Sequence, residues 1–238
     1  MQHEEIKKLN EIENKEKNNV SNDNILIFCA HPDDEILGVG GAIAKYSQEG
    51  KNVISIIYSY GENGNWWLKE EHTKDIRAKE SLKAGKIVGT KETFFLGLKD
   101  LSLKDEVKRE DVKEKILSLI EFYKPKKIFT HSFDDVVYPD HIAVYESVIE
   151  AVKKLGIKTE IYVFNIWGKD IRSSKNLKLV VDVTKTFKLK IKALKEFKSQ
   201  KFLVMWQLTP GVVWRAFVDG LYNKCWFAEK FVRINVEE

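Results

Sequence analysis

A run of six consecutive apolar residues, 25–30, constrains the fold of this chain more than any other feature. A strand with one face in water alternates apolar and polar side chains, whereas an uninterrupted apolar run is typical of a parallel strand covered on both faces. Such a strand needs a layer of helices on each side of its sheet. With 43% hydrophobic residues among 238, the chain can supply a core of that size.

Strand-like and helix-like segments then alternate along the chain. Further strands are predicted at 53–58, 93–96, 127–130, 160–166 and 177–183. Helices are predicted from the glycine-rich segment after residue 37 to about Glu49, and at 69–88, 111–123, 141–155 and 184–198. This alternation predicts an α/β fold with a parallel, doubly wound sheet. The segment beyond residue 200 is aromatic and mixed in pattern, and it gives no clear assignment.

Length and composition favour one domain without a membrane-spanning segment. A chain of this length usually forms one α/β domain, so residues 1–23, rich in Lys, Glu and Asn, are predicted to be a polar arm and 24–238 a single domain. No segment approaches the roughly 20 apolar residues that span a bilayer, and the arm lacks the apolar centre of a secretory signal. Cys29 and Cys225 are too few for a disulfide framework, so we expect a cytoplasmic location.

The charge balance argues against a nucleic-acid partner. The 40 basic and 36 acidic side chains give a net charge of +4, whereas nucleic-acid binding favours a dense basic face. The Lys-rich stretch 185–201 is spaced through a helical pattern. We interpret it as a solvated helix face.

The loop after the first predicted strand reads His31-Pro32-Asp33-Asp34-Glu35. Proline followed by acids is also a favourable helix start, because acids complement the helix dipole. Here three carboxylates directly follow an apolar strand, and at the rim of a core a bound cation would relieve their repulsion. His31 and Asp34 are three residues apart, so one turn can aim both at one point while Asp33 is turned aside. We interpret this loop as half of a metal site.

Glycines at positions 38, 40 and 41 follow this loop and raise an alternative, a nucleotide site. The third glycine of a dinucleotide fingerprint would fall at Ile43 and is missing, and the acidic loop would repel a pyrophosphate. The sequence contains no Gly-Lys-Ser/Thr segment either. These features argue against a nucleotide site.

A second polar loop, residues 131–141, follows the predicted strand 127–130 and ends at His141. Ligands of such sheets bind beyond the carboxyl ends of the strands, where both loops are expected. A lone histidine at a helix start is more often a surface or capping residue. Two histidines with one carboxylate, however, leave coordination positions open, as in catalytic zinc sites, whereas closed structural sites use cysteine pairs. Iron(II), cobalt or nickel could occupy the same ligands.

Together these motifs resemble the LmbE-like, or PIG-L, family of zinc-dependent N-deacetylases. Residues 30–35, Ala-His-Pro-Asp-Asp-Glu, match the hallmark of that family at every position, and Gly40-Gly41 follow as its helix start. Further matches, in chain order, are Arg77-x-x-Glu80, Leu96-Gly97 with Asp100, Pro139-Asp140-His141, and Lys190 with Ala193-Leu194 and Ser199-Gln200. The resemblance therefore covers the chain from residue 25 to about residue 200.

The resemblance implies a fold, a reaction and a set of site residues. The fold would be a Rossmann-like parallel sheet flanked by helices, with a mixed α/β C-terminal portion. The reaction would be zinc-dependent removal of an N-acetyl group from a GlcNAc-type amino-sugar, giving acetate and a free amine. The implied residues are the zinc ligands His31, Asp34 and His141, the general base Asp33, and the sugar-facing Arg77 and Asp100. The resemblance is also compatible with a homo-oligomer.

One position departs from the family pattern. The histidine that usually opens the second motif and stabilises the oxyanion is Tyr138 here. A phenol donates one hydrogen bond but carries no positive charge near neutral pH. Either Tyr138 acts in its place, or His131 reaches across the loop, or catalysis is slower; packing of Tyr138 on the loop is the structural alternative. Asp140, which usually steers the replaced histidine, stays a catalytic candidate beside Tyr138.

Two other functions stay open. One is a related amidase that cleaves a larger acyl or thiol conjugate of an amino-sugar. The other is a metal- or sugar-binding relative without turnover, against which the retained Asp33 argues.

Aromatic side chains could stack on sugar rings. Trp66 and Trp67 lie on the loop side of the sheet and are interpreted as a substrate lid, whereas Trp206 and Trp214 are interpreted as core or subunit-interface residues.

Overall fold

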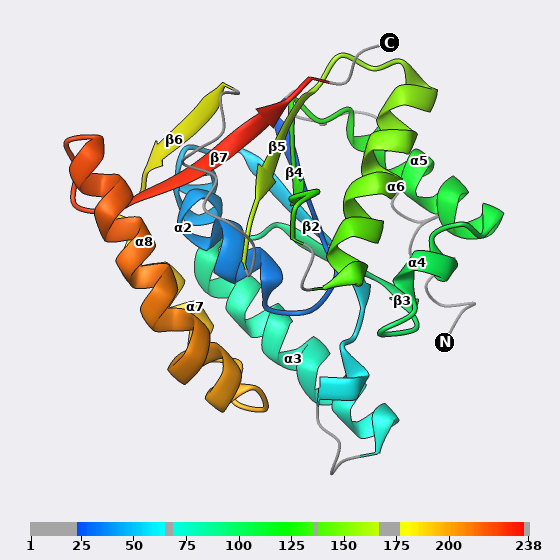
Figure 1. Ribbon diagram of the computed structural model, residues 1–238, viewed down its shortest axis with the longest axis horizontal. Coiled ribbons are helices and arrows are strands. Elements are labelled where there is room, and N and C mark those ends of the chain that lie inside the picture. The colour runs from blue at the N-terminus through cyan, green and yellow to red at the C-terminus, as the bar shows by residue number, and fades with distance from the viewer. Residues whose placement is uncertain (1–22, 65–68, 136–137, 167–176, 236–238) are drawn as a thin grey trace.

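The computed structural model describes residues 23–64, 69–135, 138–166 and 177–235 (Figure 1). The strands are β1 (Asn24–Cys29), β2 (Asn52–Ser59), β3 (Glu92–Leu98), β4 (Lys127–His131), β5 (Glu160–Phe164), β6 (Lys178–Asp182) and β7 (Ala228–Ile234). The α-helices are α2 (Asp34–Gln48), α3 (Glu70–Val88), α4 (Leu103–Glu106), α5 (Glu110–Tyr123), α6 (Pro139–Leu155), α7 (Phe187–Leu194) and α8 (Thr209–Tyr222). A short 3-10 helix, η1 (Glu62–Gly64), and a π-helical segment, η3 (Phe202–Leu208), are also present.

The described strands form one sheet in the order β3-β2-β1-β4-β5-β7-β6. The first five strands of that order are parallel, and β7 runs antiparallel to both of its neighbours. In the middle of the sheet, β1 pairs with β2 in continuous register from Asn24 opposite Asn52 to Cys29 opposite Ile57. The predicted α/β fold, a parallel sheet flanked by helices with a mixed C-terminal portion, is confirmed.

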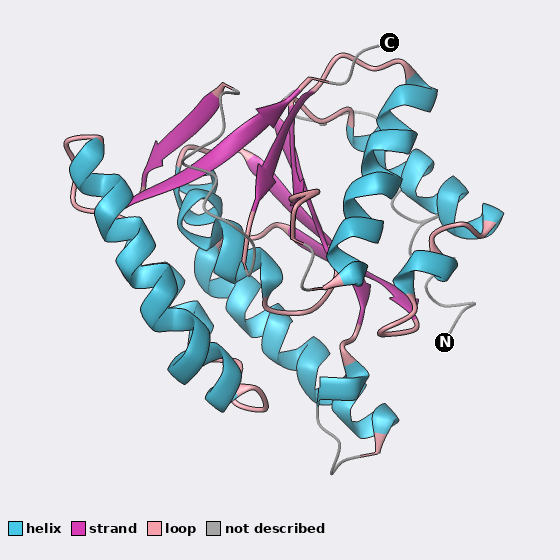
Figure 2. Cartoon of the chain, in the orientation of Figure 1, coloured by secondary structure: helices cyan, strands magenta, loops and turns pink. Residues whose placement is uncertain are grey.

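The uninterrupted apolar run of residues 25–30 divides between two cores. Its odd-numbered residues belong to the cluster formed with α2, α3 and α7, and its even-numbered residues to the cluster formed with α5 and α6. Helices therefore cover both faces of the sheet (Figure 2). Every side chain in the run is at most 2% exposed, which explains why no polar residue interrupts it.

The strand order determines which edge of the sheet carries the site. The chain runs outward from β1 through β2 to β3, and then returns to place β4 on the other side of β1. This reversal is a topological switch point, where open α/β sheets bind their ligands. The loops that leave β1 and β4 are therefore neighbours, as the sequence predicts, and they lead into α2 and α6 (Figure 1).

The C-terminal third differs most from the expectations. The helix expected at 184–198 is the shorter α7, Phe187–Leu194. At its expected start, the hydroxyl of Thr184 accepts the backbone N–H groups of Trp226 and Phe227, each at 3.2 Å, and so ties this residue to the segment before β7. The Lys-rich stretch 185–201 is not uniformly solvated either. Lys190 within it is only 1% exposed.

The structure tests the predictions for two tryptophans and for the cysteines, and it does not describe the N-terminal arm. Trp206 and Trp214 are 71% and 66% exposed, so their interpretation as core residues is wrong, and their place in a subunit interface stays a prediction. Both cysteines are free thiols, as expected. Within the described ranges, every helix is too short or too polar to cross a bilayer. The polar arm and the lid residues 66 and 67 lie outside the described residues, and the division into arm and single domain stays a prediction.

Candidate metal centre

Two loops at the carboxyl edge of the sheet bring the three predicted metal ligands together. His31 follows β1, and Asp34 is the first residue of α2. On the neighbouring side, Pro139 is the first residue of α6, a position that proline favours, and this places His141 in the first turn of the helix. Side chains that are far apart in the sequence thus face one point in space.

The distances between the ligand atoms suit a divalent metal ion. Asp34 Oδ2 lies 3.5 Å from His31 Nδ1 and 3.6 Å from His141 Nε2, and the ligand atoms of all three residues lie within 4.8 Å of one another. Two donors bound tetrahedrally to zinc at about 2.0–2.1 Å would be roughly 3.3 Å apart. The side chain of His31 is 12% exposed and that of His141 2%, so the donor atoms are largely shielded from water and His31 is the more accessible of the two histidines.

The second nitrogen of each histidine faces a buried carboxylate. His141 Nδ1 lies 2.8 Å from Asp135 Oδ2, and His31 Nε2 lies 3.0 Å from Asp100 Oδ1 and 3.6 Å from Asp140 Oδ2. These contacts leave His141 Nε2 and His31 Nδ1 directed at the Asp34 carboxylate. Because both a neutral imidazole nitrogen and a carboxylate present lone pairs, a cation between them would turn repulsion into coordination. The donor set therefore fits a metal ion.

Electrostatics around Asp34 agree with this arrangement. Burial would raise the pKa of Asp34, but the neighbouring His141 and His131 outweigh it and hold that pKa well below its usual value. Burial would likewise lower the pKa of His31, but the neighbouring carboxylates of Asp100, Asp140 and Asp34 raise it well above its usual value. The centre is thus a place where positive charge is stabilised.

Asp33 stands beside the ligands in a strained backbone conformation. Its φ angle is 111°, its carboxylate accepts a hydrogen bond from Arg77 Nη2 at 3.1 Å, and its N–H donates to Glu35 Oε2 at 3.0 Å. Burial raises the pKa of Asp33 to about 7, against the lowering effect of Arg77, while Asp34 repels a second negative charge. A carboxylate in these surroundings can exchange a proton near neutral pH.

Glu35, the last acid of the hallmark loop, has a supporting place. Its side chain is 2% exposed and accepts hydrogen bonds from the N–H of Asp33 and, at 2.9 Å, from the hydroxyl of Ser81 on α3. Burial raises the pKa of Glu35 to about 8, and the nearby Asp33 adds to the rise. Glu35 therefore joins the loop to α3 and lies away from the three ligand atoms.

Arg77 and Asp100, predicted to face a sugar, border the centre. The guanidinium of Arg77 donates to the carbonyls of Pro32 and Gly61, each at 2.7 Å, in addition to Asp33. Asp100 accepts the N–H of Asn63 at 3.0 Å and lies beside His31. Both side chains are at most 5% exposed. The structure brings them to the ligands, and their contact with a substrate stays a prediction.

The residues considered as stabilisers of the oxyanion differ in how deeply they are buried. Tyr138 is half-buried at the start of α6, with its ring centroid 5.2 Å from that of His141. His131 is fully buried and stacks on His141, with 3.8 Å between the ring centroids and 15° between the ring planes. Burial lowers the pKa of His131 to about 4, so its ring is neutral at pH 7. Asp140 accepts the N–H groups of Leu101 and Leu103 at 2.9 and 3.1 Å.

The glycines after the hallmark loop serve close packing. A Cβ at Gly38 would lie 2.3 Å from the ring of Phe164 on β5, and one at Gly41 would lie 2.9 Å from a carboxylate oxygen of Glu229 on β7. Both positions thus let α2 approach the sheet. This gives the glycine pattern a structural reason that does not involve a nucleotide phosphate.

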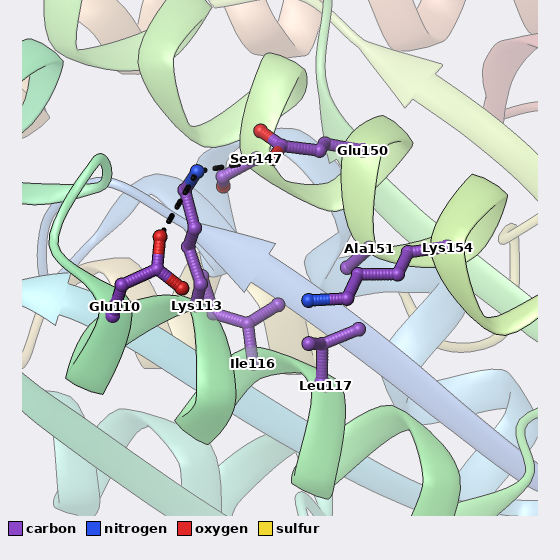
Figure 3. Close-up of a pocket in the computed structure, with 8 residues that line it drawn as sticks. All are labelled: Glu110, Lys113, Ile116, Leu117, Ser147, Glu150, Ala151 and Lys154. Atoms are coloured by element: carbon purple, nitrogen blue, oxygen red, sulfur yellow. Dashed lines mark ion pairs between the residues drawn. The ribbon is translucent and has the colours of Figure 1, made fainter.

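A separate hollow lies between α5 and α6 (Figure 3). Lys113 bridges its rim, 3.2 Å from Glu150 and 3.8 Å from Glu110. Ile116 and Leu117 form its apolar side. None of the site residues predicted from the sequence lines this hollow, so it is separate from the candidate metal centre.

Asp135 was not predicted from the sequence. It precedes the second motif by only a few residues and is fully buried against His141. The adjacent Asp134 has the same side chain, and no spacing distinguishes the two. A buried carboxylate next to a ligand histidine could be recognised only once the path of the loop was known.

Comparison with known proteins agrees with this geometry. A family model described as PIG-L: GlcNAc-PI de-N-acetylase matches residues 26–152. The chain is 31% identical to the probable N-acetyl-alpha-D-glucosaminyl L-malate deacetylase 2 of Bacillus cereus over 136 residues, 55% of this chain and 61% of that protein. The match therefore spans less than two thirds of that relative's length.

Solved structures share the fold. N,N'-diacetylchitobiose deacetylase from Pyrococcus horikoshii superposes with a TM-score of 0.74 at 21% identity, covering 97% of this chain and 92% of that one. GalB, the 4-carboxy-2-hydroxymuconate hydratase of Pseudomonas putida, also gives 0.74 at 21% identity, covering 90% and 96%. The family model extends over more than half of the sequence and includes both loops of the candidate metal centre. This chain belongs to the PIG-L family of de-N-acetylases.

Proposed function

We propose that this chain is a metal-dependent hydrolase that removes the N-acetyl group from a GlcNAc-type amino-sugar and yields acetate and a free amine. The observation that carries the proposal is the convergence of His31, Asp34 and His141 on one point, with Asp33 beside them. Membership of a de-N-acetylase family supports the same reaction. The amino-sugar is proposed by similarity to relatives whose names specify N-acetylglucosaminyl substrates.

We propose zinc as the ion. Two imidazoles and one carboxylate are a donor set that zinc favours, and they leave a position for water or substrate. When bound, such an ion lowers the pKa of water to about 7 and polarises the amide carbonyl. Iron(II), cobalt and nickel suit the same donors, so metal analysis of the purified protein is needed to choose among them.

Asp33 is the proposed general base. A base works best when its pKa lies near the working pH, and burial raises the pKa of Asp33 to about 7. The hydrogen bond from Arg77 fixes one carboxylate oxygen. In the proposed reaction Asp33 accepts a proton from the attacking water and returns it to the amine nitrogen as the C–N bond breaks.

Tyr138 is the proposed donor to the developing oxyanion. Its position at the start of α6 places it next to His141, and its hydroxyl can donate one hydrogen bond. The alternative, His131, is less suitable. Its Nε2 already lies 3.1 Å from the backbone nitrogen of Ala30 and 3.2 Å from Asp34 Oδ2, and its ring is fully buried. Arg77 and Asp100 remain the proposed sugar-facing residues, and Asp140 is proposed to support the loop that carries Asp100.

Two other reactions compete with this proposal. An amidase acting on a larger acyl or thiol conjugate would use the same residues, so only assays with different substrates distinguish it from a deacetylase. A hydratase is a second candidate, because the Pseudomonas putida hydratase has the same fold. A hydratase adds water to a carbon–carbon double bond and releases no amine.

The test measures acetate and primary-amine release from N-acetylated amino-sugars, larger acyl and thiol conjugates, and an unsaturated dicarboxylic acid. The wild-type protein is assayed after metal removal and again with zinc, alongside His141→Ala. We expect equimolar acetate and amine with zinc only, and loss of bound zinc in His141→Ala. Turnover that survives metal removal, or unchanged zinc content in His141→Ala, would contradict the proposal.

A further inference from the structure

The carboxylate of Asp135 lies behind the metal centre, on the side of His141 away from the predicted ion. It is fully buried in the loop between β4 and α6. Its Oδ2 is 2.8 Å from His141 Nδ1. A carboxylate hidden from water is costly unless it accepts hydrogen bonds, so this contact has a protonated nitrogen on the histidine side.

Distances select the tautomer of His141. Nδ1 lies within hydrogen-bond range of Asp135, whereas Nε2 lies 3.6 Å from Asp34, beyond that range. The proton of the neutral ring therefore belongs on Nδ1. This leaves the lone pair of Nε2 pointing toward Asp34 and the metal-binding point.

The neighbouring ring of His131 has two contacts at Nε2. The backbone N–H of Ala30 donates to it at 3.1 Å, which favours a proton on Nδ1, whereas Asp34 Oδ2 lies 3.2 Å from the same nitrogen, which favours a proton on Nε2. Within the described part of the chain, His131 Nδ1 and Asp135 Oδ1 are both buried without a hydrogen-bond partner. The ligand-type atoms of His131, Asp135 and His141 lie within 4.8 Å of one another.

We propose that Asp135 is the positioning residue of the metal centre: it holds the Nδ1–H of His141 and presents His141 Nε2 to the ion. The proposal rests on the proposed function, because it assumes that His141 is a ligand. Outer carboxylates of this kind orient ligand histidines in many metal sites, and their loss lowers metal affinity about 10–100-fold.

A carboxylate-to-amide variant tests the proposal. Asp135→Asn keeps the size of the side chain but can offer an N–H to His141 Nδ1 and reverse the tautomer. We expect zinc affinity, measured by competition with a chromophoric chelator, to fall about 10–100-fold. The matched control is Asp134→Asn, one residue earlier, whose carboxylate accepts from Ser132 and Asn165. The control is expected to keep wild-type affinity.

A second measurement needs no variant of Asp135. Long-range ¹H–¹⁵N spectra of the metal-free wild-type protein at about pH 8, where free imidazole is neutral, report the tautomer of each ring. The chain has only five histidines, so His→Gln variants assign the signals. We expect His141 to carry the proton on Nδ1. A proton on Nε2 of His141 would overturn the proposal even if Asp135→Asn fails to fold.

The outcomes also separate this inference from the proposed function. Absence of zinc binding by the wild-type protein would remove the proposed function itself. Wild-type binding with unchanged affinity in Asp135→Asn would leave that function standing and overturn the positioning role. Two zinc ions per wild-type chain and one in Asp135→Asn would also overturn it, because Asp135 would then be a ligand of a second ion.

Discussion

Asp33 has a backbone conformation that strains any residue with a side chain, at φ 111°. Glu35 accepts its N–H and Arg77 donates to its carboxylate, so buried neighbours hold it there. Strain of this kind costs about 1–3 kcal/mol and is concentrated at functional sites. We infer that the strain is the cost of placing a second carboxylate next to Asp34 without directing it at the same point.

Replacement of Asp33 by Asn tests its role as the base. The amide can still accept the hydrogen bond from Arg77, but it cannot take a proton from water. We expect turnover to fall about 10²–10⁴-fold while zinc content is unchanged. Rates of acetate release and metal analysis on the same preparation check this, and full turnover in the variant would remove Asp33 as the base.

Replacement of Tyr138 by Phe separates catalysis from packing. The ring beside His141 remains and only the hydroxyl is lost, so we expect kcat to fall about 10²–10³-fold with little change in KM. Tyr145→Phe on the same helix is the control, because that ring packs near Phe133 instead, 5.9 Å away. Equal rates for the two variants would mean that Tyr138 only packs on the loop.

At this scale the sequence predicts the candidate ligands better than their surroundings. His31, Asp34 and His141 follow or begin elements whose ends are visible in the apolar pattern, so their convergence could be expected. The burial of Asp135 and the stacking of His131 under His141 depend on how the second loop turns back on β4. Asp134 and Asp135 have the same side chain, and only the path of the loop decides which of them contacts His141.

Helix α2 is fastened to two later elements by a buried ion pair. Lys190 of α7 donates to the carbonyl of Leu37 at 2.8 Å and lies 2.6 Å from Glu229 of β7. The carboxylate of Glu229 in turn accepts the N–H groups of Gly41 and Ala42, at 2.9 and 2.8 Å. The pair thus joins the helix that starts with the candidate metal ligand Asp34 to the antiparallel part of the sheet.

Breaking this pair on one side is expected to be costly. Lys190→Met leaves the charge of Glu229 buried without its counter-ion, so the free energy of unfolding should fall by about 3–5 kcal/mol. Denaturant unfolding of the metal-free protein measures it. Lys192→Met, an exposed position on the same helix, is the control and should change stability by less than about 0.5 kcal/mol. Similar values for both variants would refute the structural role of the pair.

Strands were predictable from the sequence where both of their faces are buried, because such strands are uninterrupted apolar runs. The parallel strands around β1 are apolar runs, and their positions match the predictions to within a few residues. The antiparallel β7 was not recognised, because Glu229, Lys230 and Arg233 interrupt its apolar pattern. Glu229 is tolerated inside only because Lys190 and the backbone of α2 neutralise and bind it, and neither partner is near it in the sequence.

On the scale of the whole molecule, the outer side of the C-terminal region is unusually aromatic. It includes the outer helix α8, the segment η3 before it and the turn after it (Figure 1). The exposed large apolar residues there are Phe202, Trp206, Trp214, Leu221, Tyr222 and Trp226. Several large apolar side chains exposed on consecutive elements are more than the isolated ones common on monomers, which is the ground for the prediction of a homo-oligomer.

Light scattering coupled to size-exclusion chromatography tests that prediction. We expect the wild-type protein to elute as an oligomer and the double variant Trp206→Ser with Trp214→Ser to shift toward the monomer mass, since both side chains are exposed in the single chain. Leu82→Ser, an exposed apolar position on α3, is the matched control. A monomeric wild-type protein would remove the prediction.

The position of the site at the reversal of the strand order has a consequence for biosynthesis. A nascent chain that ends before β4 contains His31 and Asp34 but lacks His141, and two donors make a weak chelate. If the proposed ion binds there, tight uptake must wait until the centre of the sheet is complete, so metal loading would follow folding of the sheet instead of nucleating it.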